Sequence, residues 1–148
     1  MWTKDLSIQL SVFFTRLFLV LLAVALFTAP RLVSWFMILA GGRPVFVGRI
    51  CAAFYCCAPP AAVLLWSLDR LLAAIARGEV FTAENIALLR RCSWCCMAVA
   101  LICLGFTVTL FYFLLVAAAA AFIGLILRVV KNVFQQALAL KEENDYTI

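Results

Sequence analysis

The chain has 148 residues, of which 68% are apolar and only 13% are charged, and its net charge is +5. In a soluble domain about a quarter of the residues are charged, because its surface faces water. This composition therefore excludes a soluble globule and predicts an integral membrane protein. The absence of histidine removes the usual general base and the commonest metal ligand. Four helices of about 20 residues would leave no room for a separate catalytic or DNA-binding domain.

The first predicted span, residues 8–29, is long enough to cross a membrane once at about 1.5 Å per residue. Arg16 is its only charged residue, and Pro30-Arg31 is expected to close it. A cleaved signal peptide is the alternative, which the length of the apolar run disfavours. Residues 32–40 are too short to span and are predicted to lie at the interface or to cap the bundle.

The second predicted span, residues 46–68, contains Arg49 near its start and Pro59-Pro60 near its middle. The two prolines remove backbone donors and are expected to kink the helix. The helical pattern continues beyond the membrane into a predicted hairpin, residues 69–91. Within it, Gly78 is expected to end one helix and Thr82 to cap the next.

Residues 92–127 carry no charge and are too long for one crossing. They predict two further spans, at about 88–106 and 111–130, with a reversal between Gly105 and Phe113, which Gly105, Thr107 and Thr109 mark. The small residues from Ala117 to Ala121 and Gly124 allow a close helix contact. We expect this contact within the same chain, with a dimer interface as the alternative. A tail, residues 131–148, follows.

Lysine and arginine are unequally distributed between the two sides of this arrangement, and cytoplasmic loops carry the excess. One side has Lys4, Arg70, Arg77, Arg90, Arg91, Arg128, Lys131 and Lys141, whereas the other has Arg31, Arg43 and Arg49. Both termini are therefore predicted to be cytoplasmic. The expected fold is all-α, a single domain over residues 1–148 with four transmembrane helices in an antiparallel bundle.

The seven cysteines fall in two predicted spans: Cys51, Cys56 and Cys57, then Cys92, Cys95, Cys96 and Cys103. Cys92 and Cys95 have the C-x-x-C spacing of thiol redox and metal sites. They are predicted to lie near the cytoplasmic end of the span, and the reducing cytoplasm disfavours a thiol redox function. A metal ion bound by Cys92, Cys95 and Cys96 would require thiolates near lipid. We expect all seven to act as small apolar residues, and predict no cofactor or metal.

Arg16 and Arg49 are the charged residues most clearly inside apolar runs, where a charge costs at least about 2.5 kcal/mol. Each lies within about two turns of an interface, so snorkelling is the favoured interpretation. The alternative is a polar cavity or an anion or lipid-headgroup site, as in a small oligomeric transporter or channel. A proton-coupled cation exporter is disfavoured, because no acidic residue lies inside a predicted span.

The tail is acidic, and two arrangements are expected for it with equal weight. Glu142, Glu143 and Asp145 can fold back onto an arginine of the hairpin, one of Arg70, Arg77, Arg90 and Arg91, or remain solvated. Exposed ion pairs contribute only about 0.2–1 kcal/mol each, so charge alone does not decide between them.

Two cytoplasmic motifs resemble those of a known family. They are Gly78-Glu79-Val80-Phe81, leading into residues 82–86 and Leu89-Arg90-Arg91, and the closing residues 142–148 with Ala137 and Leu140 before them. The pattern resembles the YoaS-like family of bacterial four-span membrane proteins, which has no established activity. Tyr146 stands where that pattern has leucine, and the cysteine clusters are not part of it. The resemblance implies a bacterial cytoplasmic (inner) membrane and, as partner, a small helix-turn-helix regulator encoded nearby.

The predicted function is a non-enzymatic regulatory or scaffold protein that binds a cytoplasmic protein through residues 78–91 and the tail. The predicted partner-binding residues are Arg77, Phe81, Glu84, Asn85, Arg90, Arg91, Glu143, Asn144, Asp145 and Ile148. The alternatives are the small transporter or channel and, third, a membrane thiol oxidoreductase. The protein is expected to be surrounded by membrane lipid, and a homo-oligomer is one possible state. Direct nucleic-acid binding is not expected, because the chain has no basic stripe.

Overall fold

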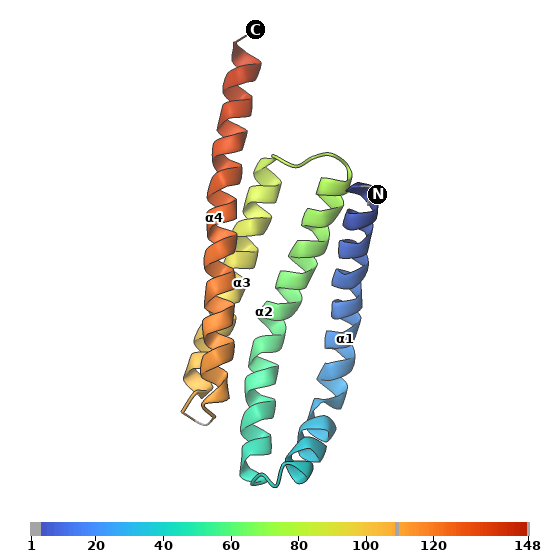
Figure 1. The fold of residues 1–148 in the computed structure, drawn as a ribbon, viewed down its shortest axis with the longest axis vertical. Helices are drawn as coiled ribbons and strands as arrows, with labels where there is room; N and C mark the ends of the chain where they lie inside the picture. Colours follow the sequence, from blue (N-terminus) through green and yellow to red (C-terminus); the bar gives the residue numbers. More distant parts are fainter. Residues whose placement is uncertain (1–3, 109, 148) are drawn as a thin grey trace.

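The computed structural model describes residues 4–108 and 110–147, which form four helices and no strand (Figure 1). The helices are α1 (Lys4–Leu39), α2 (Val45–Ala76), α3 (Ala83–Phe106) and α4 (Tyr112–Tyr146). Each is long and apolar enough to cross a membrane. This confirms the predicted all-α, four-span architecture, including the reversal between Gly105 and Phe113.

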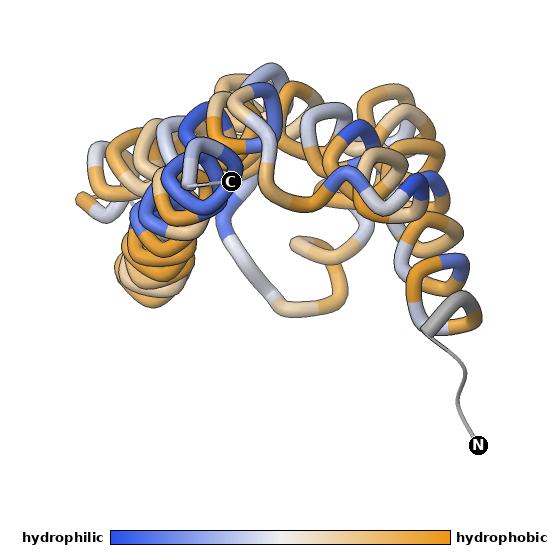
Figure 2. Tube along the Cα trace, turned by 90° about the horizontal axis from the view of Figure 1, so that it is seen from above, coloured by the Kyte–Doolittle hydropathy of each residue, from blue (hydrophilic) through white to orange (hydrophobic). Residues whose placement is uncertain are grey.

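The helices lie antiparallel in a curved row in which each packs against its neighbour in the chain (Figures 1 and 2). Across the described residues, α1 has no contact with α4. We call the end at which α1 and α3 begin and α2 and α4 end the charged end, because all seven acidic residues lie towards it in the sequence. The other end, with the connections 40–44 and 107–111, is the opposite end. The start of α1 and the end of α4 therefore both lie at the charged end.

Helix α1 does not end at Pro30, and the predicted separate segment over residues 32–40 is wrong. The helix continues through Pro30 to Leu39. Proline lacks the N–H that would bond the carbonyl four residues earlier, that of Leu26. The Tyr55 hydroxyl of α2 donates a hydrogen bond to this carbonyl at 2.8 Å. A neighbouring helix thus satisfies the group that the proline leaves free, which is how membrane helices tolerate proline.

Helix α3 is the most enclosed element of the row. Half of its most apolar 18-residue window is buried within the protein, compared with 6% for α1. Its buried Leu88 and Leu89 pack with Leu71 of α2, and residues of α4 complete this cluster: Leu127, Val130 and Phe134. The core therefore lies near the charged end, between α2, α3 and α4.

Close contact between α3 and α4 depends on Gly124. The Ser93 hydroxyl donates to the Gly124 carbonyl at 2.9 Å. A Cβ at Gly124 would lie 3.2 Å from the Cβ of Cys96 and 3.3 Å from the Sδ of Met97. The predicted small-residue contact is therefore confirmed as one within the chain, since even a Cβ at position 124 would require these neighbours to shift by a few tenths of an ångström.

Candidate functional site at the charged end

The connection between α2 and α3 is shaped by one glycine and one threonine. Gly78 has a φ of +80°, a left-handed conformation that favours glycine. The amides of Gly78 and Glu79 donate back to Ile75 and Ala74 at 3.0 and 3.1 Å, the bonding pattern of a Schellman motif. Thr82 accepts the Asn85 amide at 3.2 Å and so caps α3. Both predicted helix boundaries are confirmed.

Asn85 is the buried centre of this connection, with only 1% of its surface exposed. Its side-chain amide donates to the carbonyls of Glu79 and Val80, at 2.6 and 2.9 Å. Both amide hydrogens are thereby used inside the protein. Of the predicted partner-binding residues, Asn85 therefore holds the shape of the connection and does not present its side chain to a partner.

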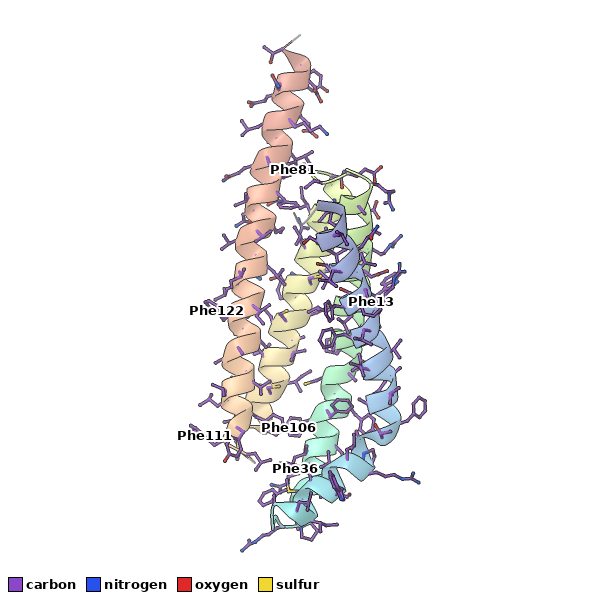
Figure 3. The ribbon with its side chains drawn as sticks, turned by 45° about the vertical axis from the view of Figure 1, so that its right-hand side comes forward. Phe13, Phe36, Phe81, Phe106, Phe111 and Phe122 are labelled. Carbon is purple, nitrogen blue, oxygen red and sulfur yellow. The ribbon has the colours of Figure 1, made fainter. Side chains whose placement is uncertain are left out.

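Phe81 joins the connection to α4. Its ring packs edge-on against that of Phe134, with 5.2 Å between the centroids (Figure 3). Phe81 remains 39% exposed, so part of its ring faces outward. Arg77 is also exposed and forms an ion pair with Glu79 at 3.4 Å. Aromatic pairs of this geometry contribute about 0.5–1.5 kcal/mol beyond their burial. The Phe81–Phe134 pair therefore attaches the connection to α4, and the two form one continuous surface.

A groove runs between the start of α3 and the part of α4 beside it. Its volume is about 470 Å³, and its lining combines small and apolar side chains with one basic and one acidic residue. The lining residues are Ala83, Ile86, Ala87, Arg90, Gln135, Leu138, Ala139 and Glu142. Of the predicted partner-binding residues only Arg90 lines it. The α4 residues of the lining fall in the predicted tail, residues 131–148, but none of them was predicted individually as a partner-binding residue, although Phe134, Leu138 and Lys141 share a helical face in the sequence.

The acidic tail does not fold back. Helix α4 continues unbroken to Tyr146 and projects beyond the other helices (Figure 1), and its last turns are the most hydrophilic part of α4 (Figure 2). Among the described residues the ion pairs are Arg16–Asp69 and Arg77–Glu79, so no tail carboxylate is paired. The physical reason is local: residues 131–146 contain no glycine or proline and are rich in helix formers.

The remaining predicted partner-binding residues lie apart from the groove lining. Glu84 and Arg91 are exposed on the first turns of α3, and Glu143, Asn144 and Asp145 are exposed on the projecting end of α4. Ile148 lies outside the described residues. The structure therefore divides the predicted set into a hairpin group and a tail group, with the groove between them.

Arg16 has a partner that the sequence did not suggest. Its Nε lies 3.1 Å from Oδ1 of Asp69, near the charged end of α2. Asp69 falls just after the predicted second span, so it was counted as outside the membrane. The pair joins α1 to α2. Neither Arg16 nor Arg49 lines any of the five cavities described for this structure.

The cysteines are all free thiols, and Cys92, Cys96 and Cys103 are buried. Over residues 4–108 and 110–147, no three histidine, cysteine or acidic side chains are placed to hold a metal ion. The closest thiol contact joins neighbouring helices, with 3.9 Å between the sulfur atoms of Cys57 and Cys103. The C-x-x-C pair therefore does not stand out chemically from the other cysteines.

Comparison with known proteins places the chain in a family without a described activity. The comparisons with curated proteins and with solved structures each gave no match. The model of one family, described as a protein of unknown function (DUF2975), matches residues 11–148. This stretch includes all of α2, α3 and α4 and most of α1. The chain therefore belongs to the DUF2975 family of proteins of unknown function.

Proposed function

We propose that this membrane protein is a non-enzymatic docking platform for a cytoplasmic protein, which it holds through an amphipathic helix seated in the α3–α4 groove. The single observation that carries the proposal is the groove itself, which continues onto the projecting end of α4. A helix laid in a groove of this kind uses apolar residues at intervals of three and four.

The lining of the groove favours such a helix. Leu138 is half-buried and supplies apolar contact, whereas Ile86 is only 6% exposed and contributes to the lining from beneath. The exposed Ala83, Ala87 and Ala139 leave room for a partner's larger side chains. Beyond the groove, Glu142, Glu143 and Asp145 are exposed and unpaired within the described chain. The partner helix is therefore expected to carry lysine or arginine at the end that lies along the tip of α4.

Two arguments from the sequence support the cytoplasmic location and the partner class. The excess of lysine and arginine at the charged end follows the positive-inside rule. The resemblance to the YoaS-like family suggests a small helix-turn-helix regulator, a class of protein with a basic surface for DNA. Such a regulator would be restrained at the membrane while its basic surface faces the acidic tip.

Co-purification from gently solubilised membranes of the native host tests the proposal. The full chain is crosslinked in membranes, purified and probed for a stoichiometric, basic protein. The groove variant Leu138→Asp and the tail variant Glu142→Lys/Glu143→Lys/Asp145→Lys are each expected to reduce recovery of that protein by at least tenfold. Gln136→Lys is the matched control, since Gln136 is exposed on the same projecting helix but lines neither the groove nor the cavity at the tip of α4.

Recovery of the chain alone, even after crosslinking, would count against the docking function. Equal loss of the partner in the Gln136→Lys control would show that general charge, rather than the groove and the tail, holds it. A partner that stays bound to both test variants would also overturn the assignment of the surface.

A further inference from the structure

Three cationic side chains converge on a second cavity between α3 and α4, which adjoins the groove and shares Arg90 with it. The cavity has a volume of about 390 Å³ and is lined by Arg90, Ser93 and Trp94 of α3 and by Arg128, Lys131 and Asn132 of α4. The spacing is the same on both helices, at positions i, i+3 and i+4, so two facing helical stripes form the walls. Its lining contains three positive charges and no carboxylate.

None of these cations is neutralised within the described part of the chain. The ion pairs there involve Arg16 and Arg77 only. The Arg128 guanidinium lies 5.5 Å from the centre of the Trp94 ring, which holds it at the cavity by a cation–π contact. The Ser93 hydroxyl donates to the Gly124 carbonyl, so the Asn132 amide and the Trp94 indole N–H are the neutral donors left in the lining. Arginine, lysine and an amide are donors suited to a phosphate.

The depth of the cavity matches the edge of a membrane. Arg90 lies about 24 Å along α3 from its end at Phe106, and Arg128 lies about 24 Å along α4 from its start at Tyr112. Lys131 is one further turn along. If a hydrocarbon core of about 30 Å begins at these helix ends, the Cα atoms of Arg90 and Arg128 lie about 6 Å inside its far edge, and their long side chains reach outward to the level of the lipid phosphates. Trp94 is 63% exposed, as expected of an aromatic residue at the interface.

Apolar surface continues from the cavity towards the opposite end. Leu101 lies two turns from Trp94 on α3, Leu125 lies one turn from Arg128 on α4, and both are more than half exposed. Phe122 also points outward from α4 (Figure 3). This surface suits acyl chains, whereas a free phosphate would use only the charged cavity.

The geometry points to a specific site for one anionic phospholipid, whose phosphate lies between Arg90, Arg128 and Lys131 and whose acyl chains follow the exposed surface of α3 and α4. Basic pockets between membrane helices on the cytoplasmic side bind such headgroups. A zwitterionic lipid is disfavoured, because its ammonium group would meet three cations and no carboxylate. Arg90 also lines the docking groove, so the site is tested at Arg128 and Lys131, which line neither the groove nor the cavity at the tip of α4.

Native mass spectrometry of the full chain in detergent, titrated with phosphatidylglycerol or phosphatidylcholine, tests the site. We expect one phosphatidylglycerol to be retained in preference to phosphatidylcholine. Each cation near a membrane surface contributes about fivefold to the affinity for anionic lipid, so Arg128→Gln/Lys131→Gln is expected to weaken retention about 25-fold. Arg128→Lys keeps the charge and is expected to retain most of the binding.

The matched control is Arg70→Gln/Lys141→Gln, which removes the same charge outside the cavity. Arg70 also lies over a tryptophan, 5.2 Å from the Trp66 ring centre. This variant is expected to stay within about twofold of the original affinity. Circular dichroism and a single elution peak establish that each variant is folded, and a variant that fails either check is replaced by Arg128→Lys/Lys131→Gln, with an expected loss of about fivefold.

Three results would overturn the proposal. Equal loss in the test and control pairs would mean that net charge alone attracts lipid. Equal retention of phosphatidylcholine would mean that the cations do not select the headgroup. Displacement of the lipid by millimolar inorganic phosphate or glycerol phosphate would identify a site for a soluble anion, without a role for the acyl chains.

Discussion

A single hydroxyl group compensates for the proline inside the first helix. Pro30 leaves the Leu26 carbonyl without its helical donor, and the Tyr55 hydroxyl of α2 replaces that donor at 2.8 Å. In hydrocarbon no water is present to take this role. The same atom therefore satisfies a backbone group and attaches α1 to α2, which the Arg16–Asp69 ion pair also does nearer the charged end.

Replacing this hydroxyl gives a double-mutant cycle. Tyr55→Phe is expected to lower the free energy of unfolding by about 0.6–1.7 kcal/mol, the range for hydrogen bonds between membrane helices. In a Pro30→Ala background the backbone amide at position 30 can bond the Leu26 carbonyl, so Tyr55→Phe is expected to cost little. Unfolding in mixed detergent micelles measures both. Equal costs in the two backgrounds would show that the hydrogen bond does not compensate for the proline.

The thiols of Cys57 and Cys103 allow a second test at the residue scale. Their sulfur atoms are 3.9 Å apart on neighbouring helices, and closure to a disulfide needs an approach to about 2.05 Å. Membrane-permeant iodine is expected to take two electrons from the pair, with loss of two protons and formation of iodide. Peptide mapping after alkylation should then find the Cys57–Cys103 link.

The controls for this oxidation are single substitutions. Cys57→Ser and Cys103→Ser should each prevent the link, whereas Cys51→Ser should leave it. A dominant link between any other two cysteines would contradict the packing of α2 against α3.

At the scale of elements, α3 organises the molecule because it is the most buried helix and packs against both α2 and α4. Its contact with α4 is close at Gly124, where an added Cβ would press against Cys96 and Met97. Its first turn holds the connection through Thr82 and Asn85. The groove and the cationic cavity both lie between α3 and α4 and depend on the position of this helix pair.

Enlarging Gly124 is expected to separate α3 from α4. Gly124→Leu should lower the free energy of unfolding by about 1–3 kcal/mol, the range for an overpacked core. Gly48→Leu on α2 is the control, since a Cβ there meets no atom within 4 Å. Unfolding in detergent gives the comparison, and equal stability of the two variants would contradict the close packing.

At the scale of the whole molecule, the curved row leaves α1 in contact with α2 alone. Only 6% of the most apolar window of α1 is buried, so lipid must cover most of this helix. The charged end contains both ends of the chain, the connection 77–82 and the projecting end of α4 (Figure 1). Features that could engage another molecule are therefore concentrated on one side of the membrane.

Reporter fusions test which side this is. A fluorescent protein fused after residue 148 is expected to be bright, because the positive-inside rule places the charged end in the cytoplasm. A phosphatase that needs export, inserted between Gly41 and Arg43, is expected to be active. The reverse pattern for both reporters would invert the orientation and remove the cytoplasmic docking proposal.

Much of the helical plan was predictable, because its signals are local. The stop at Gly78 and the cap at Thr82 depend on backbone groups within a few residues, so the sequence was sufficient to locate them. The extent of α1 was not, because the donor to Leu26 comes from residue 55. The position of the tail was left open for a related reason: its charges allowed docking and solvation equally, whereas uninterrupted helix propensity keeps residues 131–146 straight.

The candidate site divides in the same way. The sequence located a patterned hairpin and an acidic tail, since composition shows where polar residues collect. Asn85 could not be assigned its buried role, because the carbonyls that it bonds are reached only when the chain reverses at Gly78. The groove and the cationic cavity also required the structure, since each combines a stripe of α3 with a stripe of α4 that is distant from it in the sequence.

By itself the sequence determined that this is a membrane protein, because the chain has too few polar residues to cover the 68% that are apolar. Its apolar runs are long enough for four spans, and an even number of spans places both ends on one side. Only the tertiary structure decided that α1 passes through Pro30, that Arg16 meets Asp69 and that three cations share a cavity. Burial in lipid follows from composition, summed over the chain. Pairing between distant side chains follows from how closely the helices approach, which Gly124 and its neighbours set.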